Sequence, residues 1–322
     1  MKKILANDGI DKIGKELLEK AGFVVDTTKV PQEKLIDAIN ENEYSVLIVR
    51  SATQVRKDVI DACPNLKIIA RGGVGLDNID VDYAKQKGIH VINTPAASSH
   101  SVAELVFAHL LSLSRYLHLS NREMPVSGNK EFNALKKKYS EGIELKNKTI
   151  GIIGFGRIGQ EVAKISIGLQ MNVLAYDPYV VSAELELELP FLKKKVDISI
   201  HTVKLEEVLK NSDFITLHVP GGCIISKKEI EQMKNDVIII NAARGGVINE
   251  NDLLEALNKG KIRAAGLDVF ENEPTPKAEL LNHPKISITP HIGASTKEAQ
   301  ERIAIELAEK IIQTFEKIQI HS

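Results

Sequence analysis

Short apolar runs alternate along the chain with longer segments in which apolar residues recur every three or four positions. Runs of the first kind are typical of buried strands, and segments of the second kind are typical of helices. In the first third of the chain we predict strands at Lys3–Ala6, Phe23–Asp26, Ser45–Arg50, Leu66–Arg71 and His90–Asn93. Helices are predicted between them, for example at Lys12–Ala21, Gln32–Asn40 and Val81–Lys87. This alternation predicts a parallel sheet covered on both faces.

A second alternating series begins at Thr149 and predicts a second α/β domain. Its strands are expected at Thr149–Ile153, Asn172–Tyr176, Phe214–Val219, Val237–Asn241, Ala264–Val269 and Ile286–Thr289. A helix over Asn251–Leu257 should stop before Gly260, because glycine favours helix ends. The last helix is predicted at Thr296–Phe315.

The segments between and beside these series are less regular. Ser101–Leu119 is apolar on most sides and predicts a helix buried between layers or domains. Its His109 and His118 are therefore interpreted as packing or interface residues rather than ligands. Asn121–Lys148 is interpreted as a connection over the surface, and Glu184–Leu189 as an edge strand or a surface arm.

Composition narrows the function classes. The length of 322 residues suits two domains, and the net charge of -1 favours neither nucleic acid nor an anionic membrane as a partner. The start of the chain does not resemble a signal peptide, and no run of 18 apolar residues predicts a spanning helix. Cys63 and Cys223 form no CxxC pair, so we expect no metal site and a reduced, cytoplasmic setting. Any anionic ligand, such as a small-molecule substrate, must be held by local arginines or backbone amides.

A glycine-rich turn predicts a dinucleotide site. Gly154, Gly156 and Gly159 form GxGxxG directly after an apolar strand and before a helix. The glycines allow a tight turn, approach of a pyrophosphate and close packing, and the helix start supplies free amides. Asp177 ends the next strand and is placed to accept hydrogen bonds from the adenosine ribose, and Pro178 follows it instead of an arginine. We therefore predict NAD as cofactor rather than NADP; the alternative is that Asp177 only begins a turn.

Reactive side chains follow three later strands. Arg244, Asp268 and His291 each lie at or just after a strand end, and Glu273 lies in the loop after Asp268. Oxidation of an alcohol needs a base, which a histidine supplies, and a neighbouring carboxylate stabilises the imidazolium. An arginine binds a substrate carboxylate in a forked geometry. The three segments predict hydride transfer on a hydroxy acid, provided that the fold brings these groups together.

The motifs GFGRIG, NAARGG, GLDVFENEP and TPHIGASTKEAQ, in this order and spacing, resemble the D-2-hydroxy-acid dehydrogenases over nearly the whole chain. The resemblance implies that Arg244, Glu273 and His291 are catalytic. It also implies two Rossmann-like domains: an NAD-binding Rossmann domain at 99–291, inserted into a flavodoxin-like substrate-binding domain formed by 1–98 and 292–322. Besides the three glycines and Asp177, the cofactor-binding residues that it implies are Val74, Arg157, Ile158, Val219, Ala242, Ala243, Asp268, Gly293 and Ala294.

Within that family, GASTKEAQ, RGGVGLDNID and VRSATQV point toward the members that oxidise 3-phosphoglycerate with NAD at the start of serine synthesis. The resemblance implies that Arg50 and Arg71 bind the anionic groups of the substrate, while Gly72 and Gly73 let backbone amides approach a carboxylate. Two surface arginines at strand ends remain the alternative.

Other functions and several details stay open. The alternatives are a hydroxypyruvate or glyoxylate reductase, and a corepressor-like protein that binds NAD without turnover.

Ala96–Ser99 and the long stretch Tyr179–Val203 depart from relatives of the family, and Lys136–Lys138 is either a solvated face or an approach to the substrate. The family implies a homodimer formed through the nucleotide domain, with the Ser101–Leu119 helix and the arm after it as the contact. The end of the chain at Ser322 gives the expectation that a C-terminal regulatory domain is absent.

Overall fold

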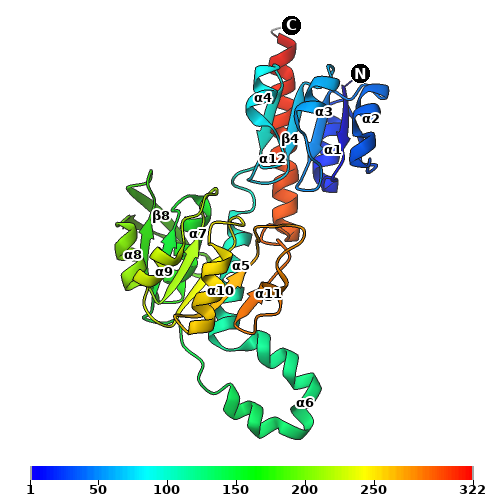
Figure 1. Cartoon of the computed structure of the whole chain (residues 1–322). Helices are drawn as coiled ribbons and strands as arrows, with labels where there is room; N and C mark the ends of the chain where they lie inside the picture. The colour runs from blue at the N-terminus through cyan, green and yellow to red at the C-terminus, as the bar shows by residue number, and fades with distance from the viewer. Residues whose placement is uncertain (1, 321–322) are drawn as a thin grey trace. The chain divides into compact units, whose positions relative to one another are not determined.

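The computed structural model describes residues 2–320, which form two compact α/β units (Figure 1). Ser99–Gly293 is one unit, and the residues on either side of it, up to Ser98 and from Ala294 onward, form the other. Within residues 2–320, no helix is both long enough and apolar enough to cross a lipid bilayer.

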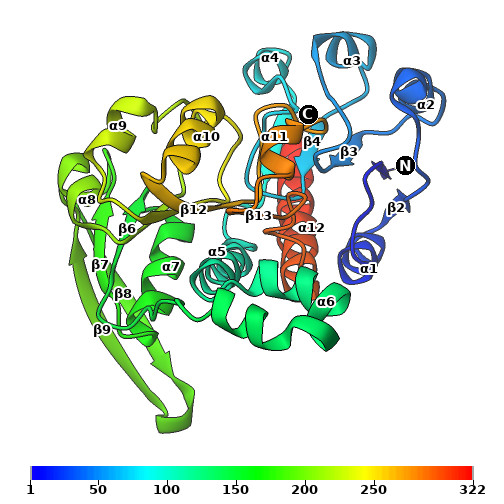
Figure 2. The ribbon, with the colours of Figure 1, turned by 60° about the horizontal axis from the view of Figure 1, so that its bottom comes forward.

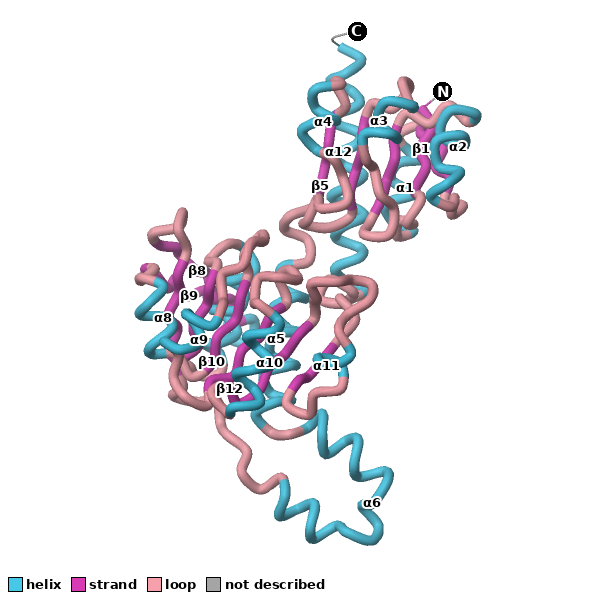
Figure 3. The backbone as a smooth tube through the Cα atoms, viewed as in Figure 1, coloured by secondary structure: helices cyan, strands magenta, loops and turns pink. Residues whose placement is uncertain are grey.

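The first unit is built on a five-stranded sheet, whose strands are magenta in Figure 3. Its order is β2-β1-β3-β4-β5, and all its strands are parallel. The strands are β1 (Lys2–Ala6), β2 (Phe23–Asp26), β3 (Val46–Val49), β4 (Ile68–Arg71) and β5 (His90–Asn93). The helices are α1 (Lys12–Lys20), the short η1 (Gln32–Lys34), α2 (Leu35–Glu41), α3 (Lys57–Ala62), α4 (Val81–Gln86) and α12 (Lys297–Ile320).

Successive side chains of this sheet face two different helical layers. The parallel register aligns Ile4 with Val46, and Leu5 with Leu47. The row of Ile4 packs against α1 and α12, while the row of Leu5 packs against α2, α3 and α4. Because both faces are buried, the strands have continuous apolar sequences instead of alternating ones.

The C-terminal helix α12 returns to the N-terminal part of the chain, as expected. A Cβ atom at Gly14 of α1 would lie 2.7 Å from the Cβ of Ala304, so a glycine is needed at this crossing. Figure 1 shows α12, in red, running beside the blue N-terminal elements of the same unit. Two segments from opposite ends of the chain thus share one core.

The second unit contains a six-stranded parallel sheet with the order β13-β12-β11-β10-β6-β7. Its strands are β6 (Thr149–Ile153), β7 (Asn172–Tyr176), β10 (Phe214–Leu217), β11 (Val237–Asn241), β12 (Ile262–Leu267) and β13 (Ile286–Ile288). Its helices are α5 (Ser99–Ser114), α6 (Leu117–Lys138), α7 (Arg157–Gly168), α8 (Leu205–Asn211), α9 (Lys227–Gln232), α10 (Glu250–Lys259) and α11 (Ala278–Leu281). Helices α5 and α7 pack on one face of the sheet, and α8, α9 and α10 on the other. The predicted α/β fold class is confirmed.

Three local predictions need correction or refinement. The predicted single helix over Ser101–Leu119 is interrupted at Tyr116, which has a left-handed backbone with φ of 54°. The predicted surface connection is instead largely the helix α6, although Pro125 lies inside it and Glu131 has non-helical angles. The long stretch after β7 forms an antiparallel hairpin of β8 (Ser182–Leu189) and β9 (Lys194–His201), with η2 (Pro190–Leu192) between them, and it projects from the sheet (Figure 2).

Candidate active site

The glycine turn of the second unit has the geometry of a diphosphate cradle. Gly154 has φ of 95°, and a Cβ at Gly159 would lie 2.2 Å from the carbonyl oxygen of Gly154. A Cβ at Gly156, by contrast, would meet open space. Gly156 is also the N-cap of the 12-residue helix α7, and without a side chain it leaves the first amides of the helix available to an anion. The turn therefore fits the pyrophosphate of a dinucleotide.

Asp177 lies at the end of β7 and ties the neighbouring loops to each other. Its Oδ2 accepts a hydrogen bond of 2.8 Å from the amide of Phe155, inside the glycine turn. Its Oδ1 accepts hydrogen bonds from the amides of Tyr179 and Val180. The carboxylate thus begins the turn after β7, and it also lies directly beside the predicted diphosphate cradle. A carboxylate oxygen has two lone pairs, so Oδ2 can accept a further hydrogen bond from a ribose hydroxyl.

The structure brings His291 and Glu273 together. The Nδ1 of His291 lies 2.8 Å from Oε2 of Glu273, and Oε1 of Glu273 accepts a hydrogen bond of 2.9 Å from the amide of Phe270. That second bond fixes the carboxylate in place. Both side chains are partly exposed, at 45% for His291 and 34% for Glu273, so a substrate can reach the ring. Because a carboxylate accepts the Nδ1 proton, Nε2 is the ring nitrogen left for acid–base chemistry.

Arg244 follows β11 in a loop that is pressed against the loop of Glu273. A Cβ at Gly245 would lie only 1.9 Å from the carbonyl oxygen of Phe270, so this approach requires a glycine. Asn241 closes the loop, because its side chain donates to the carbonyl of Arg244 and accepts from the amide of Ala243. The guanidinium of Arg244 donates to the carbonyl of Ala243 at 2.7 Å.

Asp268 organises the turn that carries His291. Its carboxylate is buried and accepts hydrogen bonds from the hydroxyl of Thr289 and from the amides of Ile292 and Gly293. His291 itself has φ of 54°, in the left-handed region that only a few non-glycine residues occupy. The carboxylate therefore binds both sides of a strained turn.

The remaining predicted cofactor residues of this unit lie along the same edge of the sheet. Val219 comes after β10, while Ala242 and Ala243 come after β11 and are buried. Arg157 and Ile158 form the first turn of α7. Among residues 2–320, no group of three or more His, Cys, Asp or Glu side chains is arranged to hold a metal ion.

The predicted substrate residues of the first unit follow β3 and β4. A Cβ at Gly73 would lie 2.4 Å from Nη1 of Arg71, so the guanidinium folds over this glycine. A Cβ at Gly72 would lie 3.7 Å from Cγ of Arg50, which places the two arginine loops side by side. Val74 accepts a hydrogen bond of 2.7 Å at its carbonyl from Asn93 of β5. Ala294 also belongs to this unit.

Arg50 lines a pocket of about 450 Å³ together with Lys29, a cation that the sequence analysis missed. The pocket lies where β1 and β3 end, which is the switch point of a sheet with this strand order and a common place for ligands. Its other lining residues are Asn7, Asp8, Gly9, Thr27, Ser51 and Ala52. The only sequence signal for Lys29 was its place shortly after β2.

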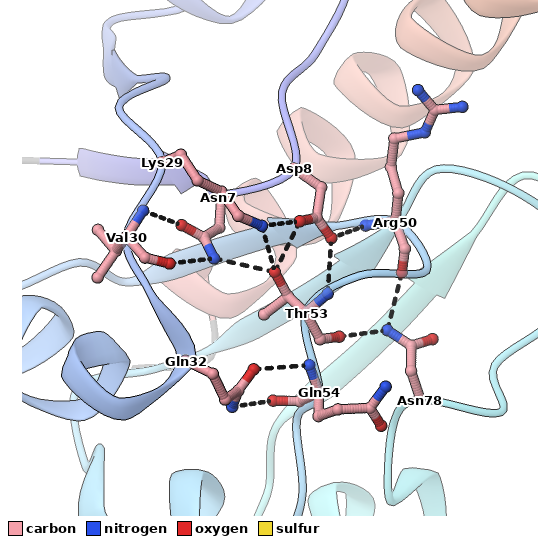
Figure 4. A network of polar contacts seen from close by, with 9 residues as sticks. All are labelled: Asn7, Asp8, Lys29, Val30, Gln32, Arg50, Thr53, Gln54 and Asn78. Atoms are coloured by element: carbon pink, nitrogen blue, oxygen red, sulfur yellow. Dashed lines mark hydrogen bonds and ion pairs between the residues drawn. The ribbon is translucent and has the colours of Figure 1, made fainter. Parts of the chain in front are cut away.

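A buried carboxylate orders this pocket (Figure 4). Asp8 accepts hydrogen bonds from Lys29, from the amides of Arg50 and Thr53, and from the hydroxyl of Thr53. Burial alone would raise the pKa of Asp8, but these hydrogen bonds outweigh it and lower the pKa. The guanidinium of Arg50 points away from this network in Figure 4. Asp8 thus fixes the backbone of Arg50 and does not bind its guanidinium in this structure.

Comparison with known proteins agrees with this geometry. Residues 107–293 match the family described as D-isomer specific 2-hydroxyacid dehydrogenase, NAD binding domain. The chain is 45% identical to a hydroxypyruvate reductase of Thermotoga maritima over 96% of this chain and 97% of that protein. It is 43% identical to a D-3-phosphoglycerate dehydrogenase of Methanocaldococcus jannaschii, over 97% of this chain but only 57% of that protein. The chain thus spans little more than half the length of this second relative.

Solved structures give the same picture of the fold. A glyoxylate reductase from Paecilomyes thermophila matches with a TM-score of 0.81 and 27% identity, over 98% of this chain and 96% of that one. An acyclic imino acid reductase in complex with NADPH and D-Arg matches with the same TM-score and identity, over 98% of this chain and 97% of that one. Both neighbours match the chain over nearly its whole length.

Proposed function

Because this chain belongs to the D-isomer specific 2-hydroxyacid dehydrogenase family and carries its NAD-binding domain, we propose that it oxidises D-3-phosphoglycerate to 3-phosphohydroxypyruvate, the first step toward serine. This substrate carries a carboxylate at one end and a phosphate at the other. Taking both anions out of water is costly unless cations meet them. The observation that carries the proposal is the pair of cations, Arg50 and Lys29, that lines one pocket of the first unit.

The catalytic roles follow from the contacts of the second unit. When bound, NAD supplies the hydride acceptor. His291 takes the hydroxyl proton on Nε2, and Glu273 stabilises the imidazolium that forms. Arg244 binds the substrate carboxylate and polarises the neighbouring oxygen. The backbone bond from Phe270 keeps Glu273 in place while the charge on the ring changes.

The phosphate is assigned to Arg50 and Lys29. Arg50 offers a forked guanidinium, and Lys29 offers a point charge whose side chain is half exposed. Since Lys29 also pairs with Asp8, the pocket keeps a net positive charge of about one from these three groups at neutral pH. Arg71 serves either end of the substrate.

A kinetic panel with phosphoglycerate, glycerate, hydroxypyruvate and glyoxylate tests the proposal. Losing an arginine that is forked to an anion should cost about 1.5 to 3 kcal/mol, or roughly 10- to 150-fold in kcat/KM. Arg50→Ala should show this loss with phosphoglycerate, and Lys29→Met a smaller loss of about 5- to 10-fold, because a lysine contact is a single point charge. Both variants should affect glycerate little, and Lys20→Met, an exposed lysine of α1, serves as the control. Equal losses with both substrates would remove these residues from phosphate binding.

A reductase acting on hydroxypyruvate is the second candidate. The Thermotoga maritima relative bears that name and matches over 97% of its length, whereas the phosphoglycerate dehydrogenase matches over 57% of its own. In that case Arg50 and Lys29 would bind a carboxylate or no substrate group. A higher kcat/KM of the unmodified enzyme for hydroxypyruvate than for 3-phosphohydroxypyruvate would favour the reductase.

We also propose that two copies associate through α5 and α6. Helix α6 exposes apolar side chains to solvent, with Val126 at 83% and Phe132 at 56% exposure, and exposed apolar groups of this size commonly mark interfaces. Sedimentation of the full chain should give a dimer. Val126→Glu combined with Phe132→Glu should shift it toward the monomer, and an unmodified chain that is already monomeric would refute the proposal.

A further inference from the structure

His109 is a buried histidine for which the proposed chemistry has no use. It lies on α5 with 3% of its surface exposed, against the face of the second sheet. A Cβ at Gly266 of β12 would lie 2.8 Å from the Cβ of His109, so a glycine in the strand makes room for it. A buried imidazole is costly unless both of its nitrogens are satisfied.

Both nitrogens of His109 have hydroxyl partners. Nδ1 lies 2.9 Å from Oγ of Ser287, and Nε2 lies 3.0 Å from Oγ1 of Thr289. The hydroxyl of Thr289 in turn donates to Oδ1 of Asp268 at 2.6 Å. A threonine hydroxyl has one hydrogen, so its oxygen must accept from His109.

These donor and acceptor roles determine which nitrogen of His109 carries the proton. His109 carries its proton on Nε2, and Nδ1 accepts the hydrogen of Ser287. Burial lowers the pKa of His109, only partly offset by the charge of Asp268, and this agrees with a neutral ring. The hydrogen bonds then all run one way, from Ser287 through His109 and Thr289 to Asp268.

The chain of hydrogen bonds ends at the turn of His291. Asp268, with 1% of its surface exposed, accepts from the amides of Ile292 and Gly293 at 2.8 and 2.9 Å. These are the two residues that follow His291, whose backbone is left-handed. Such a conformation costs on the order of 1–3 kcal/mol and persists only where the surroundings hold it. The orientation of Asp268 therefore bears directly on the position of His291.

We infer that His109 is a positioning residue: through Thr289 and Asp268 it holds the turn that places His291 for proton transfer. The inference rests on the proposed role of His291. It identifies a function for a side chain that touches neither substrate nor cofactor. Ser287 donates to Nδ1 of His109 and so favours the tautomer protonated at Nε2. Thr289 connects His109 to Asp268.

Two variants of His109 separate positioning from simple packing. Glutamine can still donate an N–H to Thr289, whereas leucine fills the space without a donor. His109→Leu should lower kcat by about 10-fold or more, as expected for one lost hydrogen bond. His109→Gln should recover most of kcat. If leucine and glutamine variants have equal kcat at equal melting temperatures, the inference fails.

A spectroscopic measurement tests the ring without using activity. In the full chain labelled with ¹⁵N-histidine, the signals absent from His109→Gln belong to His109. They should report a neutral ring protonated at Nε2 near pH 7. A ring protonated at Nδ1, or a charged ring, would overturn the inference. A His291→Asn variant with full activity would refute the proposed function instead, and it would leave the tautomer result to be judged separately.

Discussion

His291 and Glu273 form a hydrogen bond, and substitution of Glu273 by glutamine tests the role of its negative charge. Glutamine at position 273 has one side-chain oxygen, so it can accept from Nδ1 of His291 only by losing the bond from the amide of Phe270, and it cannot stabilise an imidazolium by charge. We therefore expect Glu273→Gln to lower kcat by about 10- to 100-fold, and His291→Asn by about 100-fold or more. Steady-state kinetics decide this, with Glu279→Gln on the exposed face of α11 as the control. Wild-type kcat in Glu273→Gln would exclude the carboxylate from the reaction.

Asp177 should govern the choice between NAD and NADP. Its carboxylate lies beside the glycine turn and would repel a 2′-phosphate. Asp177→Asn is the informative change, because its side-chain oxygen can keep the bonds from the amides of Tyr179 and Val180, while the charge and the acceptor for the amide of Phe155 are lost. We expect the preference in kcat/KM for NAD over NADP to fall by about 10-fold or more in this variant, which is about 1.4 kcal/mol. An unchanged ratio would show that Asp177 acts only as a turn residue.

Single residues also show which parts of the site can be predicted from the sequence alone. His291, Glu273 and Arg244 could be named from their motifs, and His291 and Glu273 are in direct contact. Lys29 could not be identified, because its contact with Asp8 joins the loops after two different strands. The partners of His109 are 178 and 180 positions away, and only the folded sheet brings them to it. Its interpretation as a packing residue was therefore incomplete.

Loop packing at the element scale leads to a prediction about Gly245. The loop after β11 and the loop after β12 meet where a Cβ at Gly245 would lie 1.9 Å from a carbonyl oxygen. Gly245→Ala must push these loops apart, and with them Arg244 and Glu273. We expect kcat/KM to fall by about 10-fold or more and the melting temperature to drop. Gly168→Ala is the control, because its Cβ would meet open space at the end of α7; equal behaviour of the two variants would contradict the argument.

The elements themselves were largely predictable where burial dictates the sequence. The strands at Thr149–Ile153 and Val237–Asn241 are confirmed to the residue, since both are almost fully buried and their apolar runs end with the strands. The strand at Phe23–Asp26 is also confirmed to the residue, although it lies at the edge of its sheet and exposes Val24. Helix α6 was missed because Pro125 and Gly128 usually mark loops. Much of this helix is exposed, so few apolar residues with helical spacing reveal it. The hairpin β8–β9 was only partly predicted, because its strands are mostly exposed.

The membership of the whole chain in its family, its α/β fold class, its enzymatic nature and its use of NAD are all confirmed. These predictions were reliable because the motifs that support them are local in sequence and each follows a buried strand. These local motifs do not decide which hydroxy acid is the substrate. We propose that this choice depends on a few cations, such as Arg50 and Lys29, which come from loops after different strands and line one pocket.

At the scale of the whole molecule, histidines whose pKa values are lowered by burial should make stability depend on pH. Burial lowers the pKa of His218 to about 3, and it also lowers the pKa of His109, His118 and His283. An unfolded chain takes up protons on these rings as the pH falls below about 6.5, whereas the folded chain does not. Unfolding is therefore favoured as the pH falls from about 6.5 toward the lower pKa values of the folded state. Carboxyls whose pKa values are lowered, such as that of Asp8, act in the same direction only at more acidic pH.

Between pH 7 and pH 5, the change in stability with pH should therefore come mainly from these histidines. His218, whose pKa is lowered to about 3, is the residue that we choose for substitution. Each buried neutral histidine should remove up to about 1.4 kcal/mol from the free energy of unfolding per pH unit below 6.5. His218→Gln keeps a side-chain amide for the hydroxyl of Thr216, which lies 3.0 Å from Nε2, but cannot be protonated in this range. We expect this variant to be less stable than the unmodified chain at pH 7, and yet to lose less stability between pH 7 and pH 5. Thermal unfolding midpoints across this range measure the difference, with exposed His90→Gln as the control. Identical slopes for the unmodified chain and His218→Gln would mean that His218 is protonated in the folded enzyme, contrary to the burial of its Nδ1.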